Sequence, residues 1–230
     1  MTRDQPVTDA NKCNLCGECV NVCVAGAREI IGQEMTVDEV LTEVKKDVIF
    51  YDESRGGVTF SGGEPLMQPE FLLALLNRCQ AQGIHTALDT SCYAEPEIVE
   101  RTGKKTDLFL CDLKHMDGNI HERFTGVGNN LILDNIKRLS EAGKEIIIRI
   151  PVIPGFNDDQ ANIEATGKFA ASLPSVSGID ILPYNRGGKE KSARLTAGVE
   201  LMQTQTPNGE KMSSIAEILN NYGFEVRIGG

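Results

Sequence analysis

Four cysteines near the N-terminus carry the clearest chemical signal in the sequence. Their spacing is Cys13-x2-Cys16-x2-Cys19-x3-Cys23. Thiolates are the ligands that iron–sulfur clusters require, and such close spacing lets one loop wrap around a cluster. A zinc knuckle and a chance grouping are the alternatives, and the ferredoxin-like spacing favours iron–sulfur over both. The loop therefore predicts an iron–sulfur protein or a descendant of one.

The same spacing indicates that this metal site is only part of a larger one. In two-cluster ferredoxins, the fourth cysteine of such a run ligates the other cluster. Cys23 would then belong to a cluster whose other ligands come from elsewhere, and the first three cysteines would need a fourth ligand. The sequence holds no second loop of this kind, because Cys79, Cys92 and Cys111 are scattered. We expect each of these three to be a small buried core residue.

A second candidate site begins at the segment Gly62-Gly63-Glu64, directly after an apolar run at 58–60. Two adjacent glycines let the backbone approach a ligand closely. The exposed amides and carbonyls of this segment, with the Glu64 carboxylate nearby, can hold an amino-acid-like group. A plain turn between a strand and a helix is the alternative interpretation.

Charged residues at the ends of the next predicted strands extend this candidate site. Asp89 ends one strand, and Asp112 and Lys114 stand at the end of the next. Two carboxylates and an ammonium at one edge can bind a zwitterion or a metal ion, and solvated salt bridges are the alternative. Arg149 differs because it lies inside an apolar strand, where an unpaired charge is costly. It must face a polar interior or a carboxylate partner, which favours a functional role.

The elements that must position these residues alternate between strands and helices. Such alternation is typical of right-handed βαβ units in a parallel sheet, and it fits both a doubly wound sheet and a barrel. Polar clusters follow four of the strands, which favours an open α/β barrel with one site at the strand carboxyl ends. The predicted strands are 57–60, 84–89, 107–113, 145–153, 178–184 and 224–228. The predicted helices cover about 36–47, 69–82, 95–102, 131–142, a stretch that follows Asn157 and ends near 172, and 209–222.

Two stretches of this pattern lead to more specific expectations. The run at 145–153 is nearly continuous in β-branched residues, as expected of a parallel strand that is covered on both faces. Asn157 and Gln160 are predicted to form the capping pair of the helix that ends near residue 172.

The composition limits the classes of function. The 230 residues include 40% hydrophobic residues and carry a formal net charge of −10, which suits one α/β domain plus a small appendage. An acidic chain lacks the basic surface that binds nucleic acid or an anionic membrane. No apolar run approaches the length of a membrane span, and residues 1–11 lack the apolar core of a secretory signal. The odd number of cysteines argues against a disulfide framework, so a cytoplasmic location is expected.

Taken together, the motifs resemble the glycyl-radical-enzyme activating enzymes, a pyruvate formate-lyase activase-like branch of the radical S-adenosylmethionine (SAM) superfamily. The resemblance runs over almost all of residues 13–230, in the family's order and spacing. The matching stretches are GGVTFSGGEPLMQPEFL (56–72), GIHTALDTSCYA (83–94), DLFLCDLKHMD (107–117), FTGVGNNLILDNI (124–136), IIIRIPVIPGFND (146–158) and ILPYN (181–185).

This resemblance implies a fold, a ligand and a reaction. The fold would be an open, partial parallel β/α barrel of the radical SAM type, with SAM lying across the strand ends and a remnant ferredoxin-like cysteine insert at the N-terminus. The family cleaves SAM reductively to a 5′-deoxyadenosyl radical, which takes a hydrogen atom from a glycine of a partner, a glycyl radical enzyme. An electron donor such as flavodoxin or ferredoxin is implied as a second partner.

The resemblance also assigns roles at the strand ends. Gly62, Gly63 and Glu64 match the segment that holds the methionine amino group of SAM. Asp89 and Asp112 match carboxylates that help to bind a cation near SAM.

Further assignments concern the reaction centre and the cysteine insert. Lys114 matches a residue that contacts SAM or the reaction centre, which makes it the catalytic candidate, and Arg149 matches a strand residue that faces this centre. Asn185 stands where the family's LPYH pattern has a histidine. The amide of Asn185 can donate and accept hydrogen bonds, but unlike a histidine it does not titrate. The loop from Cys13 to Cys23 resembles the family's ferredoxin-like insert, which implies an auxiliary 4Fe-4S cluster that these four cysteines alone need not complete.

The larger departure concerns the SAM-cleaving cluster. The family holds this cluster on a Cys-x3-Cys-x2-Cys loop upstream of the insert, and no cysteine precedes Cys13 here. We therefore expect an N-terminally truncated activase, with 1–35 as a partial insert and 36–230 as a partial barrel. We also expect that the polypeptide 1–230 alone does not cleave SAM. Formation of 5′-deoxyadenosine by the purified, reconstituted chain under dithionite would contradict this expectation.

Two other interpretations stay open at the level of sequence. One is a non-catalytic iron–sulfur electron carrier or binding module on a barrel scaffold, and the other is a barrel relic without a cluster. An in-frame Cys-x3-Cys-x2-Cys in the DNA upstream of Met1 would establish the activase interpretation. Iron and sulfide analysis, with EPR of the reduced protein, separates the other two.

Overall fold

The computed structural model describes residues 12–14, 16–30, 32–184 and 204–229. These residues form two compact units, one before Val37 and one from Val37 onward. The first unit contains the short helix α1 (Glu18–Asn21). The division of the chain into an insert over 1–35 and a barrel over 36–230 stays a prediction.

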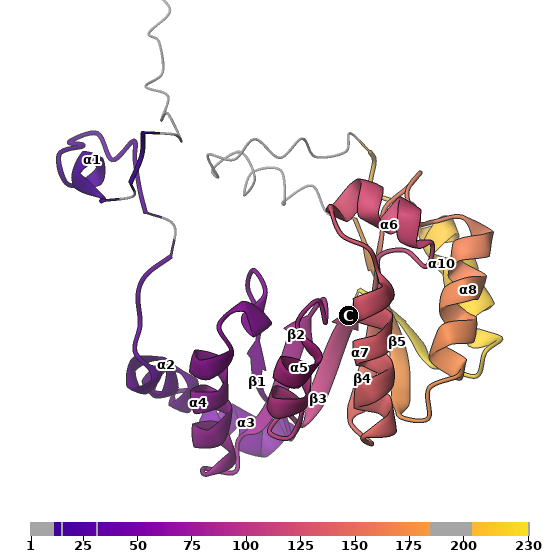
Figure 1. The fold of residues 1–230 in the computed structure, drawn as a ribbon, viewed down its shortest axis with the longest axis horizontal. Coiled ribbons are helices and arrows are strands. Elements are labelled where there is room, and N and C mark those ends of the chain that lie inside the picture. Colours follow the sequence, from indigo (N-terminus) through magenta and orange to yellow (C-terminus); the bar gives the residue numbers. More distant parts are fainter. Residues whose placement is uncertain (1–11, 15, 31, 185–203, 230) are drawn as a thin grey trace, which may run out of the picture. The chain divides into compact units, whose positions relative to one another are not determined.

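Within the described residues of the second unit, six parallel strands form one sheet and stand side by side in chain order (Figure 1). They are β1 (Gly57–Phe60), β2 (His85–Thr90), β3 (Leu108–Asp112), β4 (Glu145–Val152), β5 (Val176–Pro183) and β6 (Val226–Ile228). A doubly wound sheet reverses its strand order part-way, and this sheet does not. Because parallel crossovers are right-handed, an unreversed order places the connecting helices on one face. The structure therefore confirms the open β/α barrel arrangement.

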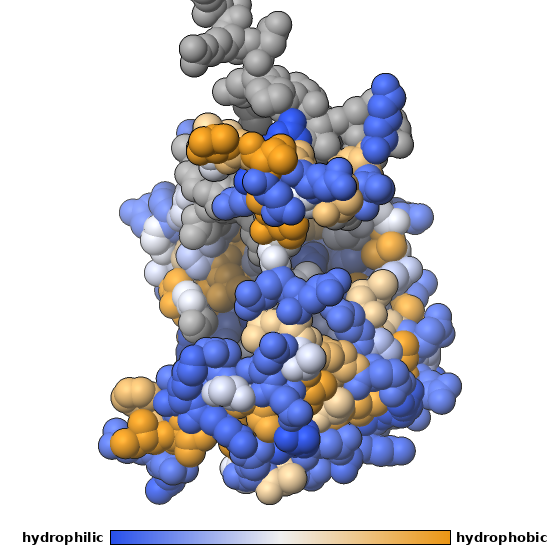
Figure 2. All heavy atoms as spheres, turned by 90° about the vertical axis from the view of Figure 1, so that its left-hand side faces the viewer, coloured by the Kyte–Doolittle hydropathy of each residue, from blue (hydrophilic) through white to orange (hydrophobic). Residues whose placement is uncertain are grey.

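Most helices lie where the hydrophobic periodicity predicts them. The exceptions are α1, α3, α6 and the 3-10 helix η1, which were not expected. The elements are α2 (Val37–Lys45), α3 (Val48–Ser54), η1 (Pro65–Met67), α4 (Pro69–Gln80), α5 (Pro96–Gly103), α6 (Gly118–Thr125), α7 (Asn130–Glu141), α8 (Gln160–Ala171) and α10 (Gly209–Asn220). None of the helices in the described ranges is long and apolar enough to cross a membrane. The face drawn in Figure 2 is largely hydrophilic, in keeping with the net charge of −10.

The predicted capping pair of α8 is wrong. A capping side chain must stand directly before the first helical residue, and Asp159 occupies that position. Its Oδ1 accepts a hydrogen bond from the Asn162 N–H at 3.0 Å. Asn157 is fully buried and serves a different purpose, which is described with the site.

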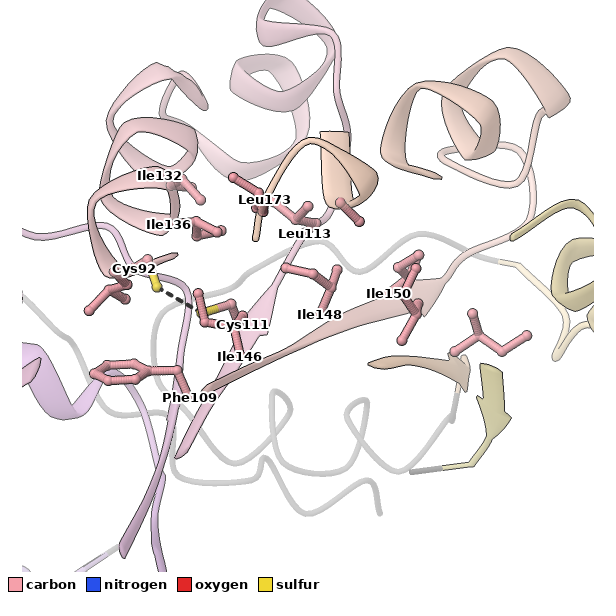
Figure 3. Packing of buried hydrophobic residues seen from close by; sticks show 14 of the residues in the cluster. Cys92, Phe109, Cys111, Leu113, Ile132, Ile136, Ile146, Ile148, Ile150 and Leu173 are labelled. Atoms are coloured by element: carbon pink, nitrogen blue, oxygen red, sulfur yellow. Dashed lines mark hydrogen bonds between the residues drawn. The ribbon is translucent and has the colours of Figure 1, made fainter. Parts of the chain in front are cut away.

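The two faces of the sheet differ in burial. On β4, Ile146, Ile148 and Ile150 are buried against the helices and belong to the main hydrophobic core (Figure 3). Ile147 and Arg149, on the opposite face of the same strand, are only partly buried. The expectation that β4 is covered on both faces is therefore wrong, because its second face looks toward the polar site.

The three scattered cysteines are buried, as predicted. Cys79, Cys92 and Cys111 have no exposed surface. The Sγ atoms of Cys92 and Cys111 lie 3.3 Å apart between the ends of β2 and β3 (Figure 3). A hydrogen bond with Cys92, together with burial, raises the pKa of the Cys111 thiol well above its ordinary value. Both residues thus act as core packing directly beneath the polar strand ends.

Candidate active site

The carboxyl ends of β1 to β4 surround a cavity of about 200 Å³. The structure brings together here all the residues predicted to hold SAM except Asn185, which lies outside the described residues. Their roles stay predictions. A second cavity, of about 280 Å³, lies at the amino ends of β1 and β2 and contains none of the predicted residues. The first cavity is lined by Ser61, Gly62, Gly63, Glu64, Asp89, Thr90, Ser91, Asp112, Lys114 and Arg149.

The Glu64 carboxylate anchors the turn after β1 to the turn after β2. Its Oε1 accepts hydrogen bonds from the Thr90 hydroxyl at 2.7 Å and from the Leu66 N–H at 3.2 Å. Its Oε2 accepts from the N–H and the hydroxyl of Ser91, at 2.9 and 2.6 Å. Because these donors occupy both oxygens, Glu64 fixes the loop rather than offering a free carboxylate to a ligand.

The two glycines before Glu64 leave open space at the edge of the cavity. Gly62 has a φ of 134°, a backbone conformation that favours glycine. A Cβ added at either Gly62 or Gly63 would meet no atom within 4 Å. A ligand can therefore approach this stretch of backbone closely. This space and the surrounding charged groups fit the amino-acid end of SAM.

Arg149 lies between two carboxylates. Its Nη1 is 2.8 Å from Asp89 Oδ2, and its Nε is 3.6 Å from Asp112 Oδ1. The Ser61 hydroxyl donates to the same Asp89 oxygen at 2.8 Å, and Lys114 Nζ is 3.9 Å from Asp112 Oδ2. Asp112 and Arg149 are register partners on β3 and β4, so both side chains leave the sheet on the same face. Arg149 thus has the carboxylate partners that its apolar strand requires.

The charged form of Asp112 is unfavourable in this position. Burial raises the pKa of its carboxyl, and Asp89 and Glu64 add to this, although Lys114 and Arg149 lower it. In the described part of the chain, Asp112 Oδ1 and Arg149 Nε are also buried without a hydrogen-bond partner. A carboxyl whose folded-state pKa exceeds its unfolded-state pKa stabilises the fold below its unfolded-state pKa. That contribution is lost as the pH rises through the folded-state pKa.

Replacing Asp112 with Asn should therefore raise Tm at neutral pH. Asn keeps the shape of the side chain and removes a charge that costs stability there. The gain over the wild type should shrink as the pH falls from 7 to about 4, because the raised pKa lets the wild-type carboxyl take up a proton more readily than an ordinary aspartate. Thermal unfolding followed by circular dichroism at both pH values measures the effect. Asp134→Asn, at an exposed carboxylate on α7, is the matched control and should show no such gain. A lower Tm for Asp112→Asn at pH 7 would contradict the prediction.

Three buried asparagines hold the loop that carries Lys114. Asn157 donates from Nδ2 to the Lys114 carbonyl at 2.8 Å. Asn129 donates to the carbonyls of the next two residues at 3.0 and 2.8 Å, and Asn162 accepts from the Met116 N–H at 2.8 Å. None of these three roles was predicted from the sequence, because the partners are backbone atoms of a distant segment.

The cysteine loop does not form a metal site in this structure. Cys13, Cys16 and Cys19 are exposed, and Cys23 is partly buried with its Sγ accepting from the Ala27 N–H at 3.2 Å. Nowhere in the described ranges do three Cys, His, Asp or Glu side chains gather as metal ligands do. Thiolates are the ligands that a 4Fe-4S cluster takes, so the auxiliary cluster at this loop stays a prediction, and no chemical step is derived from the loop.

Comparison with known proteins explains why these residues converge. The sequence model of the radical SAM superfamily matches residues 10–165, which include the cysteine loop and every residue that lines the cavity. This chain belongs to the radical SAM superfamily. SAM and a 4Fe-4S cluster are the cofactors that membership implies. SuiB from Streptococcus suis, solved with SAM bound, shares the fold: the TM-score is 0.66 at 15% identity, and the match covers 89% of this chain and 45% of SuiB.

Closer relatives place the chain within one branch of the superfamily, the glycyl-radical-enzyme activating enzymes. The trans-4-hydroxy-L-proline dehydratase activating enzyme of Clostridioides difficile is 43% identical over 98% of this chain and 85% of its own length. The indoleacetate decarboxylase activating enzyme of Tractidigestivibacter scatoligenes is 36% identical over 94% and 69%. A domain of the pyruvate-formate lyase-activating enzyme from Bacteroides vulgatus has a TM-score of 0.65 and 43% identity, and covers 76% of this chain and 99% of that domain. The resemblance deduced from the motifs is confirmed.

Proposed function

We propose that this radical SAM protein binds SAM in the cavity at the carboxyl ends of β1 to β4, and that the bound SAM is used to activate a glycyl radical enzyme. One observation carries the proposal. The open backbone at Gly63, the Asp89–Arg149–Asp112 cluster and the Lys114 ammonium all line one polar cavity. The cavity is smaller than the 300–1,000 Å³ typical of whole ligand sites, so it suits one end of SAM, with the remainder lying along the open strand ends.

Each part of the cavity has a distinct task in this proposal. The backbone of Gly62 and Gly63 would hold the methionine amino group, in a position that Glu64 fixes. Arg149 and Lys114 supply positive charge for the SAM carboxylate or for the reaction centre, with Lys114 as the catalytic candidate. At 35% exposure, the Lys114 side chain is the more accessible of these two cations.

The Asp89 and Asp112 carboxylates would hold a cation beside SAM. Carboxylate oxygens are the ligands that hard cations prefer, and the Ser61 hydroxyl adds an oxygen next to Asp89. Arg149 already neutralises part of this charge, so a bound ion would share the two carboxylates with its guanidinium.

The reaction sets the partners. When bound and reduced by one electron, SAM supplies a 5′-deoxyadenosyl radical that takes a hydrogen atom from a glycine. We propose a glycyl radical enzyme as the protein partner, a flavodoxin or ferredoxin as electron donor, and an auxiliary 4Fe-4S cluster at the cysteine loop. The proposal of a glycyl radical enzyme as partner is supported by relatives that are named as activating enzymes. Cluster chemistry that depends on free thiols favours the cytoplasm.

Gly63→Ala tests the proposal because it should affect the binding of SAM without affecting the fold. The added methyl meets no protein atom, so Tm should stay near the wild-type value, but it fills the space assigned to SAM. SAM binding should weaken by about tenfold or more, equivalent to about 1.4 kcal/mol. Isothermal titration calorimetry under anaerobic conditions measures the affinity.

The matched control is Gly178→Ala on β5, at the opposite end of the sheet. Its Cβ would lie 3.6 Å from the Glu225 carbonyl oxygen, an ordinary contact. This variant should bind SAM like the wild type. Equal affinities for the wild type and both variants would place SAM elsewhere, and no binding by the wild type would overturn the proposal.

A further inference from the structure

Two unfavourable features meet close to Glu64, one in the turn after β2 and one on the helix α7 that contacts this turn. Cys92 has a φ of 59°, in the left-handed region that residues with a Cβ rarely adopt. Asn135, on α7, is completely buried, and its Oδ1 has no hydrogen-bond partner among the described residues. Strained backbone and unsatisfied buried polar atoms are uncommon, and strained backbone clusters at functional sites. Both features occur here at one point of contact.

Hydrogen bonds connect Asn135 to the Glu64 carboxylate. The Asn135 side chain donates from Nδ2 to the carbonyls of Cys92 and Ala94, at 2.9 and 2.8 Å. The Cys92 N–H donates to the Thr90 hydroxyl oxygen at 2.9 Å, and the Thr90 hydroxyl donates to Glu64 Oε1 at 2.7 Å. Three successive hydrogen bonds thus lead from the buried face of α7 to the anchor of the glycine turn.

Ser91 gives the turn its second hold on Glu64. It lies between Thr90 and Cys92, and its N–H and hydroxyl both donate to Glu64 Oε2. The direction of an N–H is fixed by the peptide plane, so the Ser91 N–H points at Glu64 only while the turn keeps its conformation. Both carboxylate oxygens therefore depend on the segment that Asn135 holds.

We propose that Asn135 is a positioning residue for the SAM site. By clamping the strained turn at Cys92, it aims Thr90 and Ser91 at Glu64 and so sets the glycine turn that faces the ligand. The amide nitrogen of Asn135 offers the two donors that the carbonyls of Cys92 and Ala94 need, and its oxygen is left without a partner among the described residues. The SAM part of this inference rests on the proposed function, whereas the clamp on Glu64 does not.

Asn135→Leu, which keeps a similar volume without donors, tests the clamp. Amide hydrogen exchange at Ser91 should accelerate by about tenfold, and SAM affinity should fall by a similar factor. Exchange of amides inside β4 should stay unchanged. The control is Ser140→Ala on the same helix, whose buried hydroxyl accepts from the Ser175 N–H at the amino end of β5. It should leave Ser91 exchange and SAM affinity at wild-type values.

A double-mutant cycle with Glu64→Gln separates positioning from general stability. If Asn135 acts through Glu64, adding Asn135→Leu to Glu64→Gln should change SAM affinity little. The proposal would be overturned if the losses of SAM affinity in Asn135→Leu and Glu64→Gln were additive in the double variant. It would also be overturned if Ser91 exchanged in Asn135→Leu at the rate seen in Ser140→Ala. If Asn135→Leu does not fold, Asn135→Ala carries the same comparison. A wild type that does not bind SAM would refute the proposed function, and the exchange measurement would still decide the clamp.

Discussion

Replacing Glu64 with Gln should destabilise the fold by about 2–3 kcal/mol and weaken SAM binding by more than about tenfold. Gln has the same shape, but its nitrogen cannot accept a hydrogen bond. In the wild type, each oxygen of the Glu64 carboxylate accepts one hydrogen bond from a backbone N–H, of Leu66 or of Ser91, and one from a hydroxyl. Hydroxyl groups can rotate to accept from the new amide, whereas an N–H cannot. In either orientation of Gln, one of these N–H groups therefore loses its acceptor.

Urea denaturation measures the stability part of this prediction, and calorimetry measures the binding part. Glu70→Gln on α4 is the matched control, because it makes the same chemical change in an exposed pair with Arg101. An exposed pair of this kind contributes no more than about 1 kcal/mol. Equal losses in the two variants would mean that Glu64 is an ordinary surface carboxylate.

Arg149→Met should cost about 2–3 kcal/mol at neutral pH, a value between those of exposed and buried ion pairs. Methionine fills the space but leaves Asp89 and Asp112 without the guanidinium that lies between them. Without the guanidinium, which lowers the pKa of the Asp112 carboxyl, burial and the neighbouring Asp89 raise that pKa further, so the deficit should shrink as the pH falls and Asp112 takes up a proton. SAM binding should weaken in the same variant, because a cation of the site is lost.

The measurement is the free energy of unfolding at pH 7 and at about pH 5, where a carboxyl of raised pKa begins to bind a proton. Arg138→Met serves as the control, since Arg138 forms an exposed pair with Glu100 on the outer helices. Its effect should stay within about 1 kcal/mol at both pH values. A deficit for Arg149→Met that grows as the pH falls would contradict the assigned ion pairs.

The convergence of the charged residues could be predicted because it follows from topology. Parallel strands in chain order bring their carboxyl ends to one edge, so Asp89, Asp112 and Lys114 had to meet there once the strands were recognised. The need of Arg149 for a polar interior or a carboxylate partner followed from its apolar neighbours alone. The burial of each face could not be predicted, because a run of β-branched residues looks the same whether its second face meets helices or a polar interior.

The asparagines could not be assigned from sequence because their partners are remote backbone atoms. Asn135 meets Cys92, and Asn157 meets Lys114, in each case across 43 residues of chain. A partial signal existed for Asn135: it falls on the apolar face of a helix, beside Ile132 and Ile136, where a polar residue needs a specific reason. Asn157 lay close to a helix start and was interpreted as a cap, which hid its connection to another loop.

Asn129, Asn157 and Asn162 form hydrogen bonds with main-chain atoms of the Lys114 loop. Nearly every amino acid has the same main-chain atoms. Evolution can therefore exchange the side chains of this loop while its path stays constant, except that the Met116 N–H excludes proline. A loop held in this way is a place where relatives can diverge without rebuilding the scaffold. The two relatives compared above are named as activating enzymes of different enzymes, a dehydratase and a decarboxylase.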